Sequence, residues 1–193
     1  MPVALLALEG SITDVLHTLL VQTGVGWALL GASLAVMFGG MGSAQGIRIA
    51  AAQGAGVLAE KPELFGRLLV FIAMPGTQGI YGLIGFFMIV RSIGLTETDV
   101  AIGPMAGLGL LAVGFGAGMV LWRSAVYQGE TSAASISLVA KKPDQMGRAI
   151  AFPALVETYA LLALLAAILL INWLTNPGLV LPDALPVPPS VGG

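Results

Sequence analysis

The chain has 193 residues, of which 57% are hydrophobic and 9% are charged, and its formal net charge is −2. Water-soluble domains carry about 25% charged residues, so this composition indicates an integral membrane protein. The small net charge favours no nucleic-acid partner. The absence of cysteine excludes disulfides, thiolate metal sites and cysteine nucleophiles. Because the single histidine, His17, lies near the N-terminus, we expect neither a histidine metal centre nor a catalytic triad.

The chain divides into a leader, two apolar hairpins and a tail. Leucine and isoleucine recur near helical spacing in the leader, which is predicted to be an amphipathic helix at the membrane interface; the alternative is that it extends the first span. Four apolar segments of membrane-spanning length follow. The tail is rich in proline and glycine and should be extended or loosely ordered. The predicted units are the leader 1–20, a first helical hairpin 21–99, a second helical hairpin 100–174 and the tail 175–193.

Basic residues set the expected topology. Five of them lie in the two polar turns, 60–67 and 141–148: Lys61, Arg67, Lys141, Lys142 and Arg148. The leader and the tail hold none, and the loop 94–101 lies beside Arg91 alone. Since basic loops stay on the cytoplasmic side, both turns are predicted to be cytoplasmic and both termini external.

The two polar turns also reveal an internal repeat. Ala59-Glu-Lys-Pro62 aligns with Ala140-Lys-Lys-Pro143 at an offset of 81 residues, and the same offset places Ser43-Ala44 on Ser124-Ala125. A period of this length indicates a duplicated helical hairpin with two spans in each copy. The sequence therefore predicts an all-α integral membrane fold of four transmembrane helices, arranged as two duplicated antiparallel hairpins.

One carboxylate interrupts the fourth span. Glu157 lies well inside the apolar run 152–171 and has no basic neighbour along it. A carboxylate at the centre of a spanning helix costs a few kcal/mol, and such groups usually mark an ion pathway. The alternative is a carboxylate that snorkels near a helix end. The repeat places Gly76 at the equivalent position of the first hairpin, so only one of the two copies carries this carboxylate.

Counting residues from the turns places further polar groups at the depth of Glu157. Gln128 and Glu157 lie about 21–23 Å from their turn at 1.5 Å per residue, and Thr77 and Gln78, 15 and 16 residues after Pro62, lie at about the same level. Such a layer has the oxygens to bind a hard monovalent cation, and a proton needs fewer. Pro75 can free a backbone carbonyl near Met74, and Tyr81 lies one turn beyond Thr77, within reach of the carboxylate. The alternative for each glutamine is an interhelical hydrogen bond that only holds spans together.

Several motifs resemble one known family. These are Met74-Pro-Gly-Thr-Gln-Gly-Ile-Tyr81, Tyr127-Gln-Gly129, Ala140-Lys-Lys-Pro143 and Val156-Glu-Thr-Tyr-Ala160. They are similar to the proteolipid K (c-type) subunit of V-type ATPases, most of all its sodium-pumping bacterial form, over about residues 39–170. The resemblance implies a homo-oligomeric membrane ring, with spans one and three inside and two and four outside. It also implies that Na⁺ is held by Glu157, Gln128, Thr77, Gln78 and the Met74 carbonyl, with Tyr81 hydrogen-bonded to the carboxylate.

The resemblance also implies partners and a mechanism. The ring would carry Na⁺ across a prokaryotic plasma membrane, coupled to ATP hydrolysis or synthesis, without cofactor or catalytic residues of its own. Its expected partners are identical subunits, membrane lipid, a stator subunit with an essential arginine, and central-stalk subunits on the cytoplasmic turns.

Three alternatives remain open at this point. The same rotor could carry H⁺, the chain could be a small dimeric proton-coupled secondary transporter, or it could be a purely structural assembly protein. The resemblance also leaves charged residues in the inner spans unexplained. Arg48 and Glu130 either pair between inner helices or, together with Arg123, face the lumen of the ring.

Overall fold

The computed structural model describes residues 11–94 and 102–176. Within these ranges the chain is helical and has no strand, which confirms the predicted all-α class. The predictions for residues 1–10, for most of the loop 94–101 and for nearly all of the tail 175–193 lie outside the described residues.

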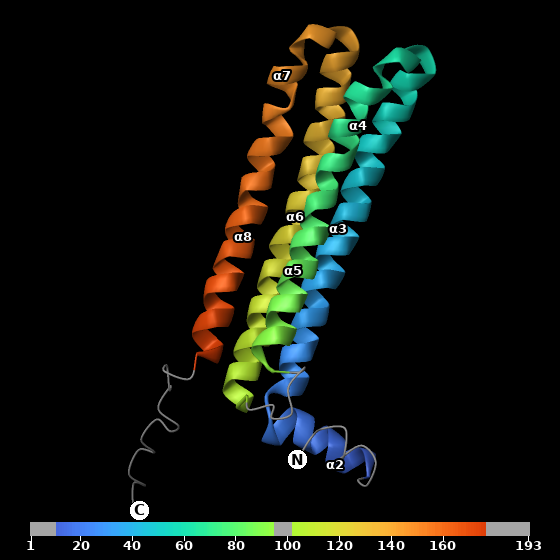
Figure 1. The fold of residues 1–193 in the computed structure, drawn as a ribbon. Coiled ribbons are helices and arrows are strands. Elements are labelled where there is room, and N and C mark those ends of the chain that lie inside the picture. Colours follow the sequence, from blue (N-terminus) through green and yellow to red (C-terminus); the bar gives the residue numbers. More distant parts are fainter. Residues whose placement is uncertain (1–10, 95–101, 177–193) are drawn as a thin grey trace, which may run out of the picture.

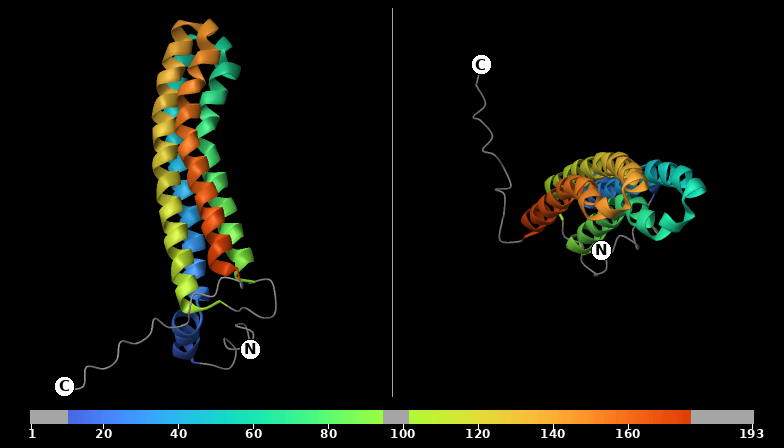
Figure 2. Two further views of the ribbon diagram at one scale, coloured as in Figure 1. Left: turned by 90° about the vertical axis from the view of Figure 1, so that its left-hand side faces the viewer. Right: turned by 90° about the horizontal axis from the view of Figure 1, so that it is seen from above.

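Four long helical stretches form an elongated bundle (Figures 1 and 2). The first and third are continuous helices, α3 (Val25–Glu60) and α6 (Pro104–Lys141). Each of the other two is interrupted. The second stretch consists of a 3₁₀ turn (Pro62–Leu64), α4 (Phe65–Ala73), a 3₁₀ turn (Met74–Gly76) and α5 (Thr77–Ser92). The fourth stretch consists of a 3₁₀ turn (Pro143–Gln145), α7 (Met146–Ala149) and α8 (Ala151–Thr175). All four stretches are long and apolar enough to cross a membrane.

The two hairpins pack through their first helices. The most extensive contact in the bundle joins α3 to α6, whereas α5 packs mainly on α3 and α8 mainly on α6. Glycine allows the close approach, because a Cβ on Gly31 would lie 2.5 Å from the Leu110 carbonyl oxygen and 2.7 Å from the Leu111 Cα. Backbone-to-backbone contact of this kind is how helices associate where lipid supplies no hydrophobic driving force. The glycine-rich spans one and three are therefore the tightly packed pair.

The two polar turns lie side by side at one end of the bundle (Figure 1). The Lys61 ammonium donates to the Ala140 carbonyl at 2.6 Å, and the Arg67 guanidinium donates to the Pro143 carbonyl at 3.3 Å. Each contact joins one hairpin to the other, and each satisfies a carbonyl oxygen at or near a helix end. The duplicated turns thus form one continuous face.

Both outer stretches are interrupted near a proline. Pro153 has no N–H to offer to the Ala149 carbonyl, and the helix breaks there between α7 and α8. The buried Ser135 on α6 donates its hydroxyl to that Ala149 carbonyl at 2.9 Å. A freed carbonyl inside a membrane segment needs such a partner, because no water is available to supply one. In the first hairpin, Pro75 lies within the 3₁₀ turn Met74–Gly76.

The leader contains a short helix that does not continue α3. Helix α2 (Ile12–His17) starts with a capping box made by Ser11 and Asp14 and passes into a π-helical turn, Thr18–Gln22. Thr23 is extended, so the chain turns before α3 begins at Val25. Helix α2 therefore lies across the end of the bundle opposite the polar turns (Figure 1).

Two apolar clusters fill the bundle on either side of its middle. The cluster near α2 is Val25, Ala28, Ala32, Ile89, Ile93, Leu110 and Ile171, and the cluster near the turns is Ala50, Leu64, Leu68, Phe71, Ile136, Val139 and Ala149. The polar residues of spans two, three and four lie between these clusters. Such a layer is shielded from both membrane surfaces by close-packed hydrocarbon.

Candidate ion-binding site

The middle of the bundle brings together the polar residues that the sequence places at one depth. Thr77 and Gln78 open helix α5, Gln128 lies on α6, and Glu157 lies on α8. Gln78 and Gln128 are completely buried, and Thr77 and Glu157 are half-buried. Three spans thus contribute to one polar group in the membrane interior.

A continuous series of hydrogen bonds links these side chains. The Thr77 hydroxyl has the Met74 carbonyl at 3.0 Å and the Gln78 Oε1 at 3.3 Å as acceptors. The Gln78 Nε2 donates to Gln128 Oε1 at 2.7 Å, and the Gln128 Nε2 donates in turn to Glu157 Oε2 at 3.4 Å. The carboxylate is therefore connected through both glutamines to the start of α5.

The second carboxylate oxygen has its own donor. The Tyr81 hydroxyl lies 2.8 Å from Glu157 Oε1 and donates to it across the gap between α5 and α8. Both oxygens of Glu157 thus accept a hydrogen bond, which is what an ionised carboxylate can do, since it is an acceptor only. A charge in this position needs a counter-ion, because a bare charge facing lipid is costly.

Two serines that sequence reasoning missed hold the surrounding backbone. Ser124 Oγ donates to the Val156 carbonyl at 3.2 Å and accepts from Gln78 Nε2 at 3.5 Å. Ser43 Oγ accepts from the Gly79 N–H at 2.8 Å. These serines occupy the same position in the two repeats, an alignment that the sequence shows without indicating their role at the site. Each fixes the outer helix of its own hairpin against the inner one.

Charged side chains on the inner helices lie outside this polar layer. Arg48 and Glu130 are both exposed, and within the described ranges they form no pair with each other. Arg123 stands over the Tyr127 ring, 4.8 Å from its centroid, and donates to the Tyr127 hydroxyl at 2.5 Å. Arg123 therefore already has an aromatic partner on its own helix.

A family model decides the classification. The model for the C subunit of ATP synthase matches residues 30–89 and 102–170. The chain belongs to this family. The two matched segments fall in the first and the second hairpin, in keeping with the duplication that the polar turns indicate.

Two relatives narrow the classification within this family. The V-type sodium ATPase subunit K of Enterococcus hirae is 34% identical over 148 residues, covering 77% of this chain and 92% of the relative. The A-type ATP synthase subunit K of Methanocaldococcus jannaschii is 40% identical over 142 residues, covering 74% of this chain and 60% of that relative. The chain is accordingly a proteolipid of the c type, a non-catalytic, ion-translocating membrane subunit of a rotary ATPase. Members of this family form oligomeric rings.

Proposed function

We propose that this protein carries Na⁺ across the membrane as part of the rotor ring of a V-type or A-type ATPase. Glu157 supplies the negative charge, and Thr77, Gln78, Gln128 and the Met74 carbonyl supply neutral oxygens. The observation that carries the proposal is the hydrogen-bonded series that links the Met74 carbonyl, Thr77, Gln78 and Gln128 to the Glu157 carboxylate. The name of the Enterococcus hirae relative, a sodium ATPase subunit, points the same way.

The oxygens around the carboxylate suit a hard monovalent cation. Such ions are bound by several oxygens that replace the water shell. Thr77 Oγ1 lies 3.0 Å from the Met74 carbonyl oxygen and 3.3 Å from Gln78 Oε1, so three neutral oxygens are close together. Gln128 Oε1 accepts one hydrogen bond from Gln78, and a carbonyl oxygen has a second lone pair to offer an ion.

A transported proton would need fewer partners than Na⁺. A protonated carboxyl group donates one hydrogen, so one of its oxygens needs an acceptor nearby. At Glu157 the Tyr81 hydroxyl faces one oxygen and the Gln128 amide N–H₂ faces the other. The Tyr81 hydroxyl can accept as well as donate, so these two contacts fit either form of the carboxyl group. What favours a cation is the presence of further neutral oxygens on Thr77, Gln78 and Met74, which a proton would not need.

In the proposed cycle, rotation of the ring carries the loaded carboxylate through lipid to a stator subunit. An arginine of the stator would compete for Glu157 and release the ion into a half-channel. Each Na⁺ moved against the membrane potential requires about 2.3 kcal/mol per 100 mV, which ATP hydrolysis supplies as torque. The joined polar turns, with exposed Lys141, Lys142 and Arg148, would seat the central stalk on the cytoplasmic side of a prokaryotic plasma membrane, with both termini external.

The test is protection of Glu157 from a carbodiimide in the purified ring. We expect millimolar Na⁺ at neutral pH to slow labelling at least about tenfold, with no effect of K⁺ at equal ionic strength. The Glu157→Gln ring, which keeps the shape of the side chain, should assemble but take up no label. Labelling that responds to pH and ignores Na⁺ would assign the carrier to H⁺ instead. Wild-type Na⁺ transport by Glu157→Gln would remove Glu157 from the mechanism altogether.

A further inference from the structure

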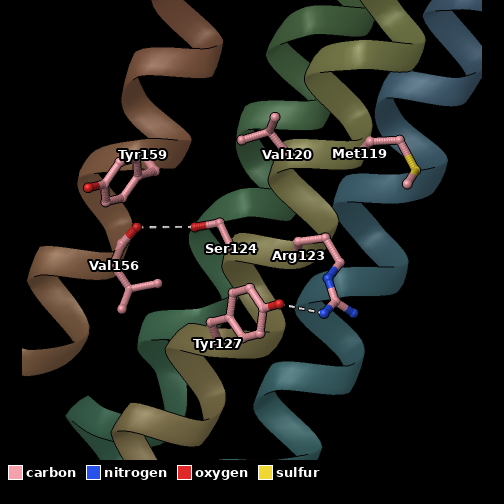
Figure 3. Close-up of a pocket in the computed structure, with 7 residues that line it drawn as sticks. All are labelled: Met119, Val120, Arg123, Ser124, Tyr127, Val156 and Tyr159. Carbon is pink, nitrogen blue, oxygen red and sulfur yellow. Dashed lines mark hydrogen bonds between the residues drawn. The ribbon is translucent and has the colours of Figure 1, made fainter.

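A hollow of about 490 Å³ opens between α6 and α8 on the outer surface of the second hairpin (Figure 3). Ser124 and Tyr127 line it from α6, and Val156 and Tyr159 line it from α8. Tyr127 and Tyr159 are 45% and 69% exposed, so two large aromatic rings stand uncovered beside it. The second hairpin thus has an open face next to the polar layer.

The internal repeat identifies the surface of the first hairpin that is equivalent to this open face. Subtracting the offset of 81 converts Arg123, Ser124 and Tyr127 into Gly42, Ser43 and Gly46 of the first hairpin. In the first hairpin this face is covered by α6, and the backbone of Gly46 lies directly against that of Gly129. The hollow is therefore the second hairpin's version of the surface through which the two hairpins pack.

The repeat offset of 81 residues also identifies the residues that would cover the hollow. Within one chain, the α6 residues that lie against Gly42 and Gly46 are Trp122, Ala125 and Gly129. Their repeat equivalents on α3 are Met41, Ala44 and Arg48, and all three are exposed. The matching occupant is thus the α3 helix of a second copy of this chain, placed beside α6 as the ring continues.

Depth decides which charged groups meet at this contact. Gly31 lies between Leu110 and Gly114, and Gly46 lies between Ala125 and Gly129. Helices α3 and α6 therefore run parallel, with a level shift equal to the repeat offset. When copies are related by rotation about an axis along the membrane normal, equivalent residues of all copies lie at the same depth in the membrane. Arg48 of the next copy therefore lies level with Gly129, one residue from Glu130.

Both charges lack a partner within the described part of one chain. Arg123, the nearest basic side chain along α6, is held by Tyr127. Unpaired charges at membrane depth are costly, and opposite charges there usually pair. An arginine and a glutamate at one level of adjoining faces satisfy each other.

We propose that Arg48 of one copy forms an ion pair with Glu130 of the next and closes the interface between neighbouring hairpins. The pair lies between inner helices of different copies, on the lumen side of the hollow. This inference rests on ring assembly and not on which ion the ring carries.

Charge reversal tests the ion pair. Arg48→Glu and Glu130→Arg should each raise the ratio of free subunits to ring in detergent about tenfold, as read by native mass spectrometry. The double variant Arg48→Glu/Glu130→Arg should restore the ratio to within about threefold of the wild type. The control is Arg91→Glu, an exposed arginine at the far end of α5, which should leave the ratio unchanged. The proposal would be overturned if the double variant had as high a ratio of free subunits to ring as the less stable of the two single variants.

Proximity is tested separately, because the chain has no cysteine of its own. Oxidation of the Arg48→Cys/Glu130→Cys ring should give a ladder of covalent oligomers, while each single variant gives only monomer. Cross-linking confined within single chains would place the two residues together in one copy and refute the pairing between copies. Both readouts are independent of Na⁺, so a ring that carries H⁺ gives the same results.

Discussion

Tyr81 and Glu157 lie on the two outer helices, and the Tyr81 hydroxyl spans the distance between them with a 2.8 Å hydrogen bond to the carboxylate. Helices α5 and α8 share far less contact with each other than with their inner partners. The hydrogen bond therefore holds Glu157 toward the polar layer at a place where packing is thin. In the proposed cycle the carboxylate leaves its site for a stator arginine, and a restraint of this reversible kind suits that step.

Tyr81→Phe removes the hydroxyl and keeps the ring. A hydrogen bond to a charged group contributes about 1.5–3 kcal/mol, so the Na⁺ concentration that half-protects Glu157 from carbodiimide should rise at least about tenfold. The matched control is Tyr159→Phe on α8, two residues from Glu157 and 69% exposed, which should not alter protection. Equal protection in the two variants would show that the hydroxyl does not restrain the carboxylate.

Thr77→Val replaces a hydroxyl by a methyl group of similar size at the start of α5. The variant loses the oxygen that joins the Met74 carbonyl to Gln78, and we expect Na⁺ protection of Glu157 to weaken at least about tenfold while the ring still assembles. Thr158→Val is the control, because the exposed Thr158 hydroxyl donates only to the Leu155 carbonyl of its own helix. A loss of Na⁺ protection in both variants would instead indicate a general disturbance of the bundle.

The sequence alone is sufficient to predict the depth of the polar layer in the membrane, but not the hydrogen bonds within that layer. Helical rise is constant, so counting residues from two duplicated turns places Gln128 and Glu157 at one level. Rotamers and amide orientation depend on neighbours in space. Counting could not show that Gln128 presents its nitrogen to the carboxylate and its oxygen to Gln78. The structural role of Ser124 was also hidden, because serine is common at helix contacts in membranes.

The break near Pro153 could be expected from proline chemistry, whereas its partner could not. Proline frees the carbonyl four residues earlier, but any of several side chains could have satisfied it. Only the packing of α6 against α7 brings Ser135 to the Ala149 carbonyl. The turn at Thr23 that separates α2 from α3 likewise has no strong sequence signal, since the leader's hydrophobic spacing also allows a continuous helix.

Ser135→Ala should destabilise the second hairpin. The substitution leaves the Ala149 carbonyl without its donor in a membrane segment, and an unsatisfied buried group costs about 1–3 kcal/mol. We expect a lower midpoint for thermal dissociation of the ring at unchanged Na⁺ occupancy, measured by gel mobility against temperature. Ser137→Ala is the control, because Ser137 donates only to the Ala133 carbonyl of its own helix. If the thermal dissociation midpoints of Ser135→Ala and Ser137→Ala are equal, the Ser135 hydroxyl is not needed to satisfy the Ala149 carbonyl that Pro153 leaves free.

Gly31→Ala tests the backbone contact between the inner helices. The added methyl group would meet the Leu110 carbonyl oxygen at 2.5 Å, and because that neighbour is backbone, the two helices must move apart. Overpacking of this kind costs about 1–3 kcal/mol, more than the roughly 1 kcal/mol that alanine gains over glycine in a helix. Gly56→Ala on the same helix has open space around its Cβ and should be neutral or slightly stabilising. Thermal unfolding of both variants in detergent measures the difference, and a Gly31→Ala protein as stable as Gly56→Ala would mean that α3 and α6 do not need this close approach.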